Sequence, residues 1–225
     1  MIQIAENKTA SEVARFNMIE QQIRTWEVLD PVVLALLNEL PREHFVPAEY
    51  QGLAFADIEI PIGAGQTMLS PKLEGRMLQA LSIQKTHNVL HIGTGSGYMA
   101  ALLATLAKQV TSVEINAQLS EKAAHKLSQH NIQNVNLVVA DGAFGLPHQA
   151  PFDVIVYTGS SPVEPAGVRN QLAIGGALLL VLGTGPAMQA TLIQRLSETG
   201  FRQDVLFETY VPELINAPHA AKFEF

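Results

Sequence analysis

A glycine-rich segment at residues 93–97 constrains the fold of this chain more than any other part of its sequence. It reads Gly-Thr-Gly-Ser-Gly and joins an apolar run at residues 89–92 to an Ala- and Leu-rich segment at residues 98–107. Glycines allow the sharp turn between a strand and a helix, and they let a ligand approach the backbone closely. The pattern therefore predicts a strand, a ligand-binding turn and a helix, the first unit of a Rossmann-like α/β fold.

The segments that follow repeat this alternation. A helix is expected at residues 117–130, and apolar runs predict further strands at residues 110–115, 135–140, 152–158 and 177–182. Strands that alternate with helices form right-handed βαβ units and a mainly parallel sheet. Two more strands, at residues 189–197 and 205–211, have no long helix between them, which predicts an antiparallel hairpin at the end of the sheet.

The N-terminal third is expected to be mainly helical. Apolar residues recur at helical spacing within residues 10–43, and Asp30 followed by Pro31 is a typical helix start. Residues 45–71 are rich in Pro and Gly and predict an irregular loop. A further helix is expected at residues 71–81.

The length and composition suit one compact globular unit. The chain has 225 residues, of which 48% are hydrophobic and 16% are charged, and this balance argues against disorder. We expect an N-terminal helical and acceptor-loop extension at residues 1–80 that packs on a Rossmann-like domain at residues 81–225.

The same composition argues against several other classes of protein. The net charge is −7 and there is no dense run of Lys or Arg, which argues against nucleic-acid binding. The chain has no cysteine, and His87 and His91 lie roughly 13 Å apart on one strand, too far to bind one metal. Apolar runs are too short to span a membrane, and residues 1–8 lack the pattern of a signal peptide. We therefore expect a cytoplasmic protein with no metal, no nucleic-acid partner and no membrane association.

Two acidic residues follow the next two predicted strands at positions that suit an adenosyl ligand. Glu114 closes the second strand, 21 residues after Gly93, where this fold places an acid that accepts hydrogen bonds from ribose hydroxyls. Asp141, at the end of the third strand, could accept from the amino group of adenine, and Gly142 leaves room for the ring. Each could instead be an ordinary strand-end or turn residue. Ligands of open α/β sheets, however, bind where these strand ends meet.

The glycine spacing favours S-adenosylmethionine over a nicotinamide dinucleotide. A dinucleotide fingerprint has its third glycine at the position that Tyr98 occupies here. The predicted cofactor is therefore S-adenosylmethionine. Its predicted contacts are with the glycine loop, the two acids and their neighbours: Gly93, Thr94, Gly95, Gly97, Glu114, Ile115, Asp141 and Gly142.

Four motifs spread over nearly the whole chain carry a resemblance to a known family. They are Leu-Pro-Arg-Glu-His-Phe-Val-Pro at residues 40–47, Ile-Pro-Ile-Gly-Ala-Gly-Gln-Thr at 60–67, Ile-Gly-Thr-Gly-Ser-Gly-Tyr at 92–98, and Asp-Gly at 141–142 with Ala-Pro-Phe-Asp at 150–153. On these residues the chain resembles the protein-L-isoaspartate (D-aspartate) O-methyltransferases, which methylate isoaspartyl carboxylates in damaged proteins.

The resemblance implies a seven-stranded methyltransferase fold, S-adenosylmethionine as cofactor and an isoaspartyl-containing protein or peptide as substrate. It also implies that the loop at residues 65–67 covers the reactive methyl group and receives the acceptor, so Gln66 and Thr67 are candidate catalytic residues. The family pattern Gly-Gln-Thr-Ile-Ser-Gln-Pro has a serine where this chain has Leu69. Ser70 is the candidate that could take its place.

A second departure lies two residues before the first glycine. That position is usually acidic in methyltransferases of this kind, and here it is His91. His91 is still predicted to contact the cofactor through a hydrogen bond, although a neutral imidazole cannot anchor a ligand ammonium as a carboxylate would. After the fourth strand, Thr158-Gly159-Ser160 replaces the usual Thr-Ala-Ala run.

These departures keep three hypotheses open. The first is methylation of an isoaspartyl carboxylate, which is ionised at neutral pH and needs no strong base. The second is the same fold with a different acceptor. An alcohol or amine would need a base, for which His44 and His91 are the candidates. The third is a non-catalytic relative that only binds the cofactor. The oligomeric state is left open.

Overall fold

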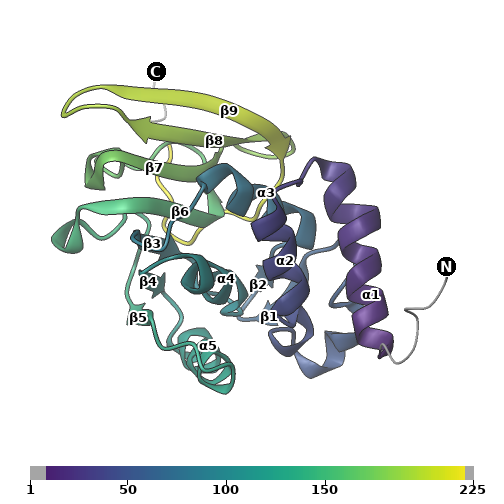
Figure 1. Cartoon of the computed structure of the whole chain (residues 1–225). Helices are drawn as coiled ribbons and strands as arrows, with labels where there is room; N and C mark the ends of the chain where they lie inside the picture. Colours follow the sequence, from purple (N-terminus) through teal and green to yellow (C-terminus); the bar gives the residue numbers. More distant parts are fainter. Residues whose placement is uncertain (1–8, 221–225) are drawn as a thin grey trace.

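The computed structural model describes residues 9–220 and shows a seven-stranded sheet with helices on one face and an additional helical layer beside it (Figure 1). Residues 1–8, for which we expected no signal peptide, and residues 221–225 lie outside the described part of the chain. Within residues 9–220 no helix is both long and apolar enough to cross a membrane.

The sheet confirms the predicted α/β class and its mainly parallel order. The strands run in the order β5-β4-β3-β6-β7-β8-β9, in which β3 to β7 are parallel and β8 is antiparallel to both of its neighbours. The strands are β3 Asn88–Ile92, β4 Gln109–Glu114, β5 Val135–Val139, β6 Phe152–Ser161, β7 Leu172–Leu182, β8 Met188–Arg195 and β9 Phe201–Thr209. The predicted terminal hairpin is formed by β8 and β9.

Strand β7 begins at Leu172, five residues earlier than expected, and therefore includes Gly175 and Gly176. The sequence suggested that these glycines precede the strand. A Cβ at Gly176 would lie 2.8 Å from the carbonyl oxygen of Asp153 and 3.1 Å from that of Phe152, both in β6. Glycine is thus required inside the strand because the neighbouring backbone approaches closely.

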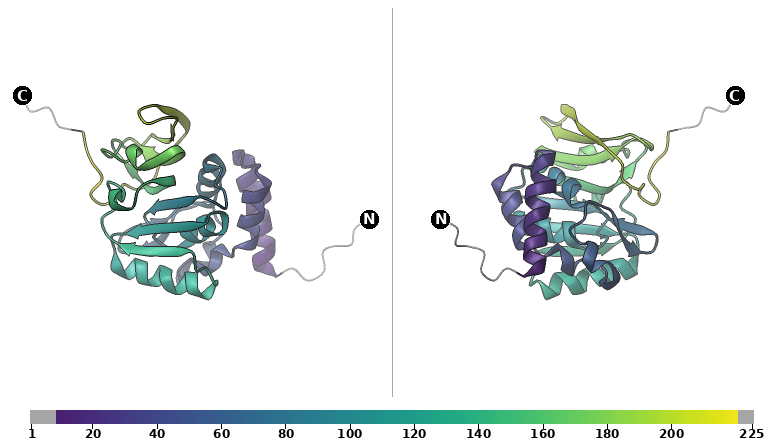
Figure 2. Two further views of the ribbon diagram at one scale, coloured as in Figure 1. Left: turned by 60° about the vertical axis from the view of Figure 1, so that its left-hand side comes forward. Right: turned by 90° about the vertical axis from the view of Figure 1, so that its right-hand side faces the viewer.

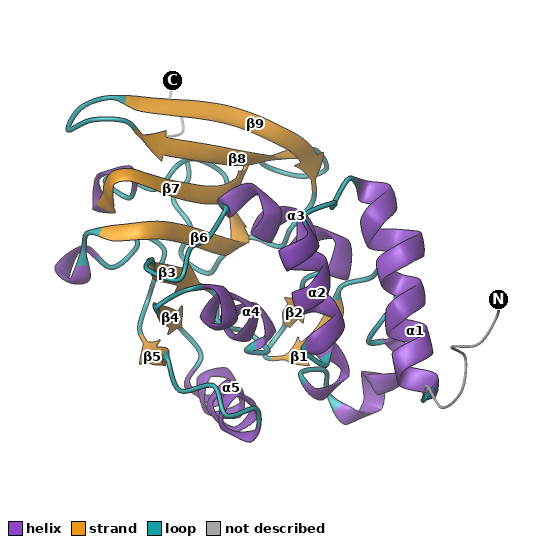
Figure 3. Cartoon of the chain, viewed as in Figure 1, coloured by secondary structure: helices purple, strands orange, loops and turns teal. Residues whose placement is uncertain are grey.

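The α-helices that follow β3 and β4 pack on the same face of the sheet. They are α4 (Tyr98–Leu106) and α5 (Ala117–Gln129), and α3 (Pro71–Leu81) lies against β7. The other face is covered by loops, as Figure 3 shows, because the connections from β5 to β6 and from β6 to β7 contain only short 3-10 turns. A separate apolar cluster that includes Ile155 and Leu180 lies under these loops.

The N-terminal residues form the expected helical layer. Helix α1 (Ala10–Met18) continues into a π-helical turn, Ile19–Ile23, which the sequence did not predict. Helix α2 (Pro31–Glu39) starts where Asp30 and Pro31 predicted it. Figure 2 shows α1 and α2 side by side, with α1 on the outside. Apolar residues of this layer and of the sheet belong to one continuous core cluster.

The prediction of an irregular segment at residues 45–71 was wrong in one important part. Strands β1 (Ile60–Gly63) and β2 (Gln66–Met68) form a short antiparallel hairpin. Its turn is made by Gly63, Ala64 and Gly65, which all have positive φ, at 96°, 54° and 71°. This turn explains the glycines that made the segment look irregular, and it places β2 beside the carboxyl ends of the sheet strands.

Replacing Asp30 tests the start of α2. The Asp30 carboxylate accepts hydrogen bonds from the backbone N–H groups of Val32 and Val33, at 2.7 and 3.3 Å. We expect Asp30→Ala to lower the free energy of unfolding by about 1 kcal/mol, whereas Asp30→Asn, which keeps a cap, changes it by only a few tenths. Urea denaturation of the three proteins measures both effects, and equal losses in the two variants would contradict a capping role.

Candidate active site

A cavity opens where the carboxyl ends of β3, β4, β5 and β6 meet the β1–β2 hairpin and the segment at residues 212–215. Its wall contains nine of the twelve residues predicted from the sequence to bind the cofactor or to act in catalysis. They are Gln66, Thr67, Gly93, Thr94, Gly95, Glu114, Ile115, Asp141 and Gly142. The other three, Ser70, His91 and Gly97, are not among the lining residues.

The glycine loop forms the floor of the cavity, and its shape depends on glycine. Gly93 and Gly95 have φ of 94° and 52°. A Cβ at Gly93 would lie 2.8 Å from the Oγ1 of Thr158. The backbone N–H groups of Gly93 and Thr94 donate to the carbonyl of Val113, at 2.9 and 3.2 Å. The loop is thus held between β4 and β6 with its main chain open to the cavity.

Gly97, also predicted to contact the cofactor, has a packing role in the structure. It precedes α4 with φ of 87°. A Cβ there would lie 3.1 Å from the Cβ of Ala123 in α5. This glycine therefore allows two helices to approach, and it lies away from the cavity wall.

The two predicted acids are held in fixed orientations at the strand ends. Glu114 is 6% exposed, and its carboxylate accepts from the N–H groups of Gly95 and Asn116, at 2.8 and 3.0 Å. Asp141 accepts from the N–H of Ala143 at 2.9 Å and from the side-chain amide of Asn216 at 2.8 Å. Both carboxylates keep further acceptor capacity for a ligand.

Gly142 lets the chain pack closely on two apolar side chains of the cavity wall. A Cβ on this residue would come within 3.0 to 3.1 Å of the side chains of Ile92 and Val113. The site thus offers carboxylate acceptors, a glycine floor and, in its wall, the apolar residues Ile92, Val113 and Ile115. This donor and acceptor set fits the ribose hydroxyls, the sulfonium-bearing chain and the adenine of S-adenosylmethionine.

His91, which was predicted to contact the cofactor, lies inside the sheet and is not among the residues that line the cavity. The residue is fully buried. Its Nδ1 lies 2.9 Å from Ser112 Oγ and its Nε2 lies 3.1 Å from Thr158 Oγ1. Burial lowers the pKa of the imidazole to about 3. The ring is therefore neutral, and both of its nitrogens are already used.

The hydrogen bonds around His91 form a directed chain. Thr158 Oγ1 donates to the carbonyl oxygen of Gly93 at 2.8 Å, so it must accept from His91 Nε2–H. Nδ1 then accepts from the hydroxyl of Ser112, which in turn lies 2.6 Å from the Thr94 hydroxyl. His91 thus connects β4 to β6. Through Ser112 and Thr158 it also orients the hydroxyl groups that contact the glycine loop at Thr94 and at the Gly93 carbonyl.

Ser70, the candidate to take the place of the family's serine, lies at the start of α3. It is the N-cap residue of α3, its carbonyl accepts from the N–H groups of Leu73 and Glu74, and it is not part of the cavity wall. Leu69 does line the cavity, beside Gln66 and Thr67 of β2. The acceptor side of the cavity therefore carries a buried apolar side chain where the family pattern has a hydroxyl.

Sequence reasoning missed several residues of the wall. Thr158 and Gly159 extend β6 into the cavity, and the C-terminal segment 212–215 covers it through hydrogen bonds between Ser160 and the backbone of Pro212 and Leu214, at 2.9 and 3.0 Å. Glu74 was also missed. The signal was present for it: it lies three and four residues before Met77 and Leu78, on the apolar side of its helix.

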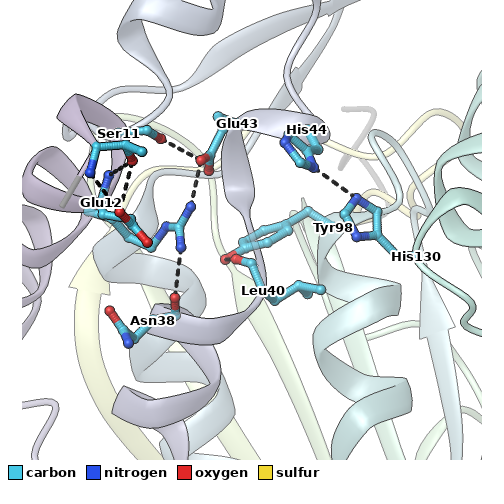
Figure 4. A network of polar contacts seen from close by, with 10 residues as sticks. Ser11, Glu12, Asn38, Leu40, Glu43, His44, Tyr98 and His130 are labelled. Atoms are coloured by element: carbon cyan, nitrogen blue, oxygen red, sulfur yellow. Dashed lines mark hydrogen bonds and ion pairs between the residues drawn. The ribbon is translucent and has the colours of Figure 1, made fainter. Parts of the chain in front are cut away.

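His44, one of the two candidate bases, lies outside the cavity. Figure 4 shows its ring pointing toward His130, with Nδ1 of His44 3.3 Å from Nε2 of His130. The ring of His130 also stacks on Phe45, with centroids 5.1 Å apart. Within residues 9–220 no group of three or more His, Cys, Asp or Glu side chains is placed to hold a metal ion.

Comparisons with known proteins agree with this geometry. The family model described as protein-L-isoaspartate(D-aspartate) O-methyltransferase (PCMT) matches residues 14–215. Protein-L-isoaspartate O-methyltransferase 1 of Rhodopseudomonas palustris (strain HaA2) is 40% identical over 196 residues, which cover 87% of this chain and 79% of the relative. The enzyme of that name from Ruegeria pomeroyi is 40% identical over 184 residues, 82% of this chain and 86% of the relative.

Two solved structures share the fold. A protein-L-isoaspartate O-methyltransferase superposes with a TM-score of 0.75 at 24% identity and covers 90% of this chain and 66% of its own. A second, described as a Plasmodium falciparum protein-L-isoaspartate O-methyltransferase in complex with S-adenosyl-L-homocysteine, has a TM-score of 0.76 at 17% identity and covers 92% of this chain and 99% of its own.

The buried His91 predicts a specific pH dependence of stability. Its folded pKa of about 3 lies below the ordinary value of 6.5, so the unfolded chain binds a proton that the folded chain does not. The stabilising contribution is complete above about pH 6.5 and is lost as the pH falls toward 3, at up to about 1.4 kcal/mol per pH unit. We expect His91→Gln to remove this part of the slope in urea denaturation between about pH 5 and 7.5.

The matched control is His148→Gln, because His148 is exposed. This control should keep the slope of the parent protein. Parallel curves for the parent and His91→Gln would show that His91 is not buried in its neutral form.

Proposed function

This chain belongs to the protein-L-isoaspartate (D-aspartate) O-methyltransferase family, and we propose that it methylates the carboxylate of isoaspartyl residues in damaged proteins and peptides. It is an S-adenosylmethionine-dependent methyltransferase. What we propose is the identity of the methyl acceptor and the residues that bind the cofactor and the acceptor.

The observation that carries this proposal is the chemistry of the cavity wall. Among the described residues that line it, there is no His, Lys, Cys or Tyr. A hydroxyl or amine acceptor has to lose a proton to a base, a part that a carboxylate can also play. Each wall carboxylate, however, is already bonded: Glu114 and Asp141 to N–H groups, Glu74 to Arg42 and Glu213 to His219. An isoaspartyl carboxyl group is already ionised at neutral pH. The wall therefore suits a carboxylate acceptor, for which orientation and exclusion of water suffice.

We assign the cofactor contacts to the strand ends. Glu114 would accept hydrogen bonds from the ribose hydroxyls, Asp141 would accept from the adenine amino group, and Gly142 would leave room for the ring. Gly93 and Gly95 would present backbone to the sulfur-bearing chain. When bound, S-adenosylmethionine supplies an electrophilic methyl group for an in-line displacement.

The β1–β2 hairpin would orient the acceptor. Gln66 and Thr67 are half-buried on β2 and line the cavity. The Thr67 hydroxyl donates to Glu59 at 3.3 Å, which fixes its rotamer. Burial raises the pKa of Glu59 above its usual value, and the hydrogen bond from Thr67 offsets only part of this effect. These side chains and the segment at residues 212–215 would keep water away from the reacting carboxylate.

A direct assay tests the acceptor. Incubation with methyl-labelled S-adenosylmethionine and an isoaspartyl peptide should give a base-labile methyl ester. The same peptide with a normal aspartyl residue is the matched control and should remain unlabelled. Binding of the cofactor without ester formation on the isoaspartyl peptide would sink the acceptor assignment and would favour a different acceptor or a non-catalytic role.

Leu69→Ser tests whether Leu69 limits acceptor binding. The added hydroxyl would face the cavity beside Thr67, where it could donate to a carboxylate. We expect the KM for the isoaspartyl peptide to fall about two- to tenfold, the effect of one neutral hydrogen bond, while the KM for S-adenosylmethionine stays constant. Leu69→Ala is the control for lost volume. Identical peptide KM values in Leu69→Ser and the parent would show that Leu69 does not set specificity.

A further inference from the structure

Glu74 is a buried carboxylate in the wall of the cavity. The contacts proposed above for the cofactor and for the acceptor do not involve it. It lies in the first turn of α3, is 2% exposed and forms part of the cavity wall. Arg42 Nη1 donates to its Oε2, and among the hydrogen bonds of residues 9–220 none reaches its Oε1. This oxygen is not among the fully buried atoms that lack a partner, so it opens to the cavity that Glu74 lines. Buried carboxylates normally have their acceptor capacity used. The oxygen that Arg42 leaves unused faces the cavity and is therefore available to a ligand.

Arg42 fixes the position of this carboxylate. Its Nε donates to the carbonyl of Ala54 at 2.8 Å, and its Nη2 donates to the carbonyl of Leu69 at 2.6 Å. The ring of Tyr98 lies 5.3 Å from the guanidinium carbon. With each of its nitrogens engaged, the guanidinium cannot turn toward the cavity. It instead holds Glu74 rigidly at the wall.

The order of the strands indicates which end of the cofactor would lie near Glu74. Asp141, Glu114 and Gly93 lie at the carboxyl ends of β5, β4 and β3, which are neighbours in that order. The proposed contacts with adenine, ribose and the sulfur-bearing chain therefore follow one line along the sheet. On the other side of β3 come β6, which brings Thr158 to the cavity, and β7, against which lies α3, the helix that carries Glu74. The amino-acid part of S-adenosylmethionine, with its ammonium and carboxylate, belongs at this end.

An ammonium group that leaves water needs a counter-charge. The described wall offers three carboxylates besides Glu74. Glu114 and Asp141 belong to the adenosine end, where two hydrogen bonds already orient each of them. Glu213 is 39% exposed and pairs with His219 at 2.8 Å. Glu74 is the described wall carboxylate that is both buried and without a partner on one oxygen.

We propose that Glu74 binds the α-ammonium group of S-adenosylmethionine through its free oxygen while Arg42 holds the other. This inference rests on the proposed cofactor contacts. His91 cannot supply the charge, because it is neutral, buried and fully hydrogen-bonded. The counter-charge for the ligand would thus come from a helix of the N-terminal extension and not from the strand that precedes the glycine loop.

The ionisation of Glu74 gives the proposal a second observable. Burial raises the pKa of Glu74 to about 7, and Arg42 acts in the opposite direction. Tyr98 of α4 is the other titratable group that interacts with it. A ligand ammonium favours the ionised carboxylate, so ligand binding should weaken as the pH falls below about 7.

Two ligands that differ only in the amino group provide the test. Calorimetric titration of the purified protein would compare S-adenosyl-L-homocysteine with its desamino analogue, in which hydrogen replaces the α-amino group. We expect the parent protein to prefer the first ligand about ten- to hundredfold, as for one charged hydrogen bond. Glu74→Gln should lose most of this preference and bind the desamino analogue as the parent does.

Glu213→Gln tests the competing carboxylate and should keep the preference. Retention of the preference in Glu74→Gln, or its loss in Glu213→Gln, would overturn the proposal. If Glu74→Gln does not fold, titrations of the parent at about pH 7.5 and pH 6 decide. The preference should fall at the lower pH, and a constant preference would refute the role of Glu74.

Failure of the proposed function gives different results. If the parent bound neither ligand, the cofactor contacts themselves would be wrong. If it bound both with the expected preference but formed no ester on an isoaspartyl peptide, the acceptor assignment alone would fail and the role of Glu74 would stand.

Discussion

The close approach of Thr158 to Gly93 is the constraint on which the rest of the site depends. No side chain fits between them, since a Cβ at Gly93 would lie 2.8 Å from the threonine hydroxyl oxygen. That hydroxyl donates to the Gly93 carbonyl and so joins the end of β6 to the turn after β3. The turn then presents its backbone to the cavity, and Gly95 N–H orients Glu114. One contact between neighbouring strands thus sets both the floor of the site and the direction of its first acid.

Arg42 plays a similar part on the opposite wall. Its buried guanidinium joins a 3-10 turn to Ala54, to Leu69 and to α3. Removing one partner of a buried ion pair leaves an uncompensated charge and costs several kcal/mol. Because one guanidinium bonds all of these segments, they are expected to move together. The hairpin that carries Gln66 and Thr67 is thereby tied to the core. An acceptor would meet a rigid wall on both sides.

Local sequence patterns predicted the parts of the molecule whose shape is decided locally. The strands, the glycine turn, the cap at Asp30 and the acids at the strand ends follow from short periods and turn chemistry. The β1–β2 hairpin was missed because its strands have only four and three residues, too few to show a period. Ser70 carries the hydroxyl that the family pattern has at the position of Leu69, but the side chains of neighbouring residues in an extended segment face opposite ways. The helix that starts at Pro71 determines which of the two side chains, Leu69 or Ser70, faces the cavity.

His91 shows why the contacts of a residue beside the site cannot be deduced from its sequence neighbours. Its partners, Ser112 and Thr158, lie on two other strands, so no local pattern could reveal them. A carboxylate at this position could only accept hydrogen bonds. The Thr158 hydroxyl would then turn toward it, and the Gly93 carbonyl would lose its donor. Histidine donates to Thr158 and accepts from Ser112, which keeps that donor directed at the loop. The imidazole therefore stabilises the turn, but unlike a carboxylate it places no negative charge under the glycine loop. A ligand ammonium then needs a carboxylate on another wall of the cavity.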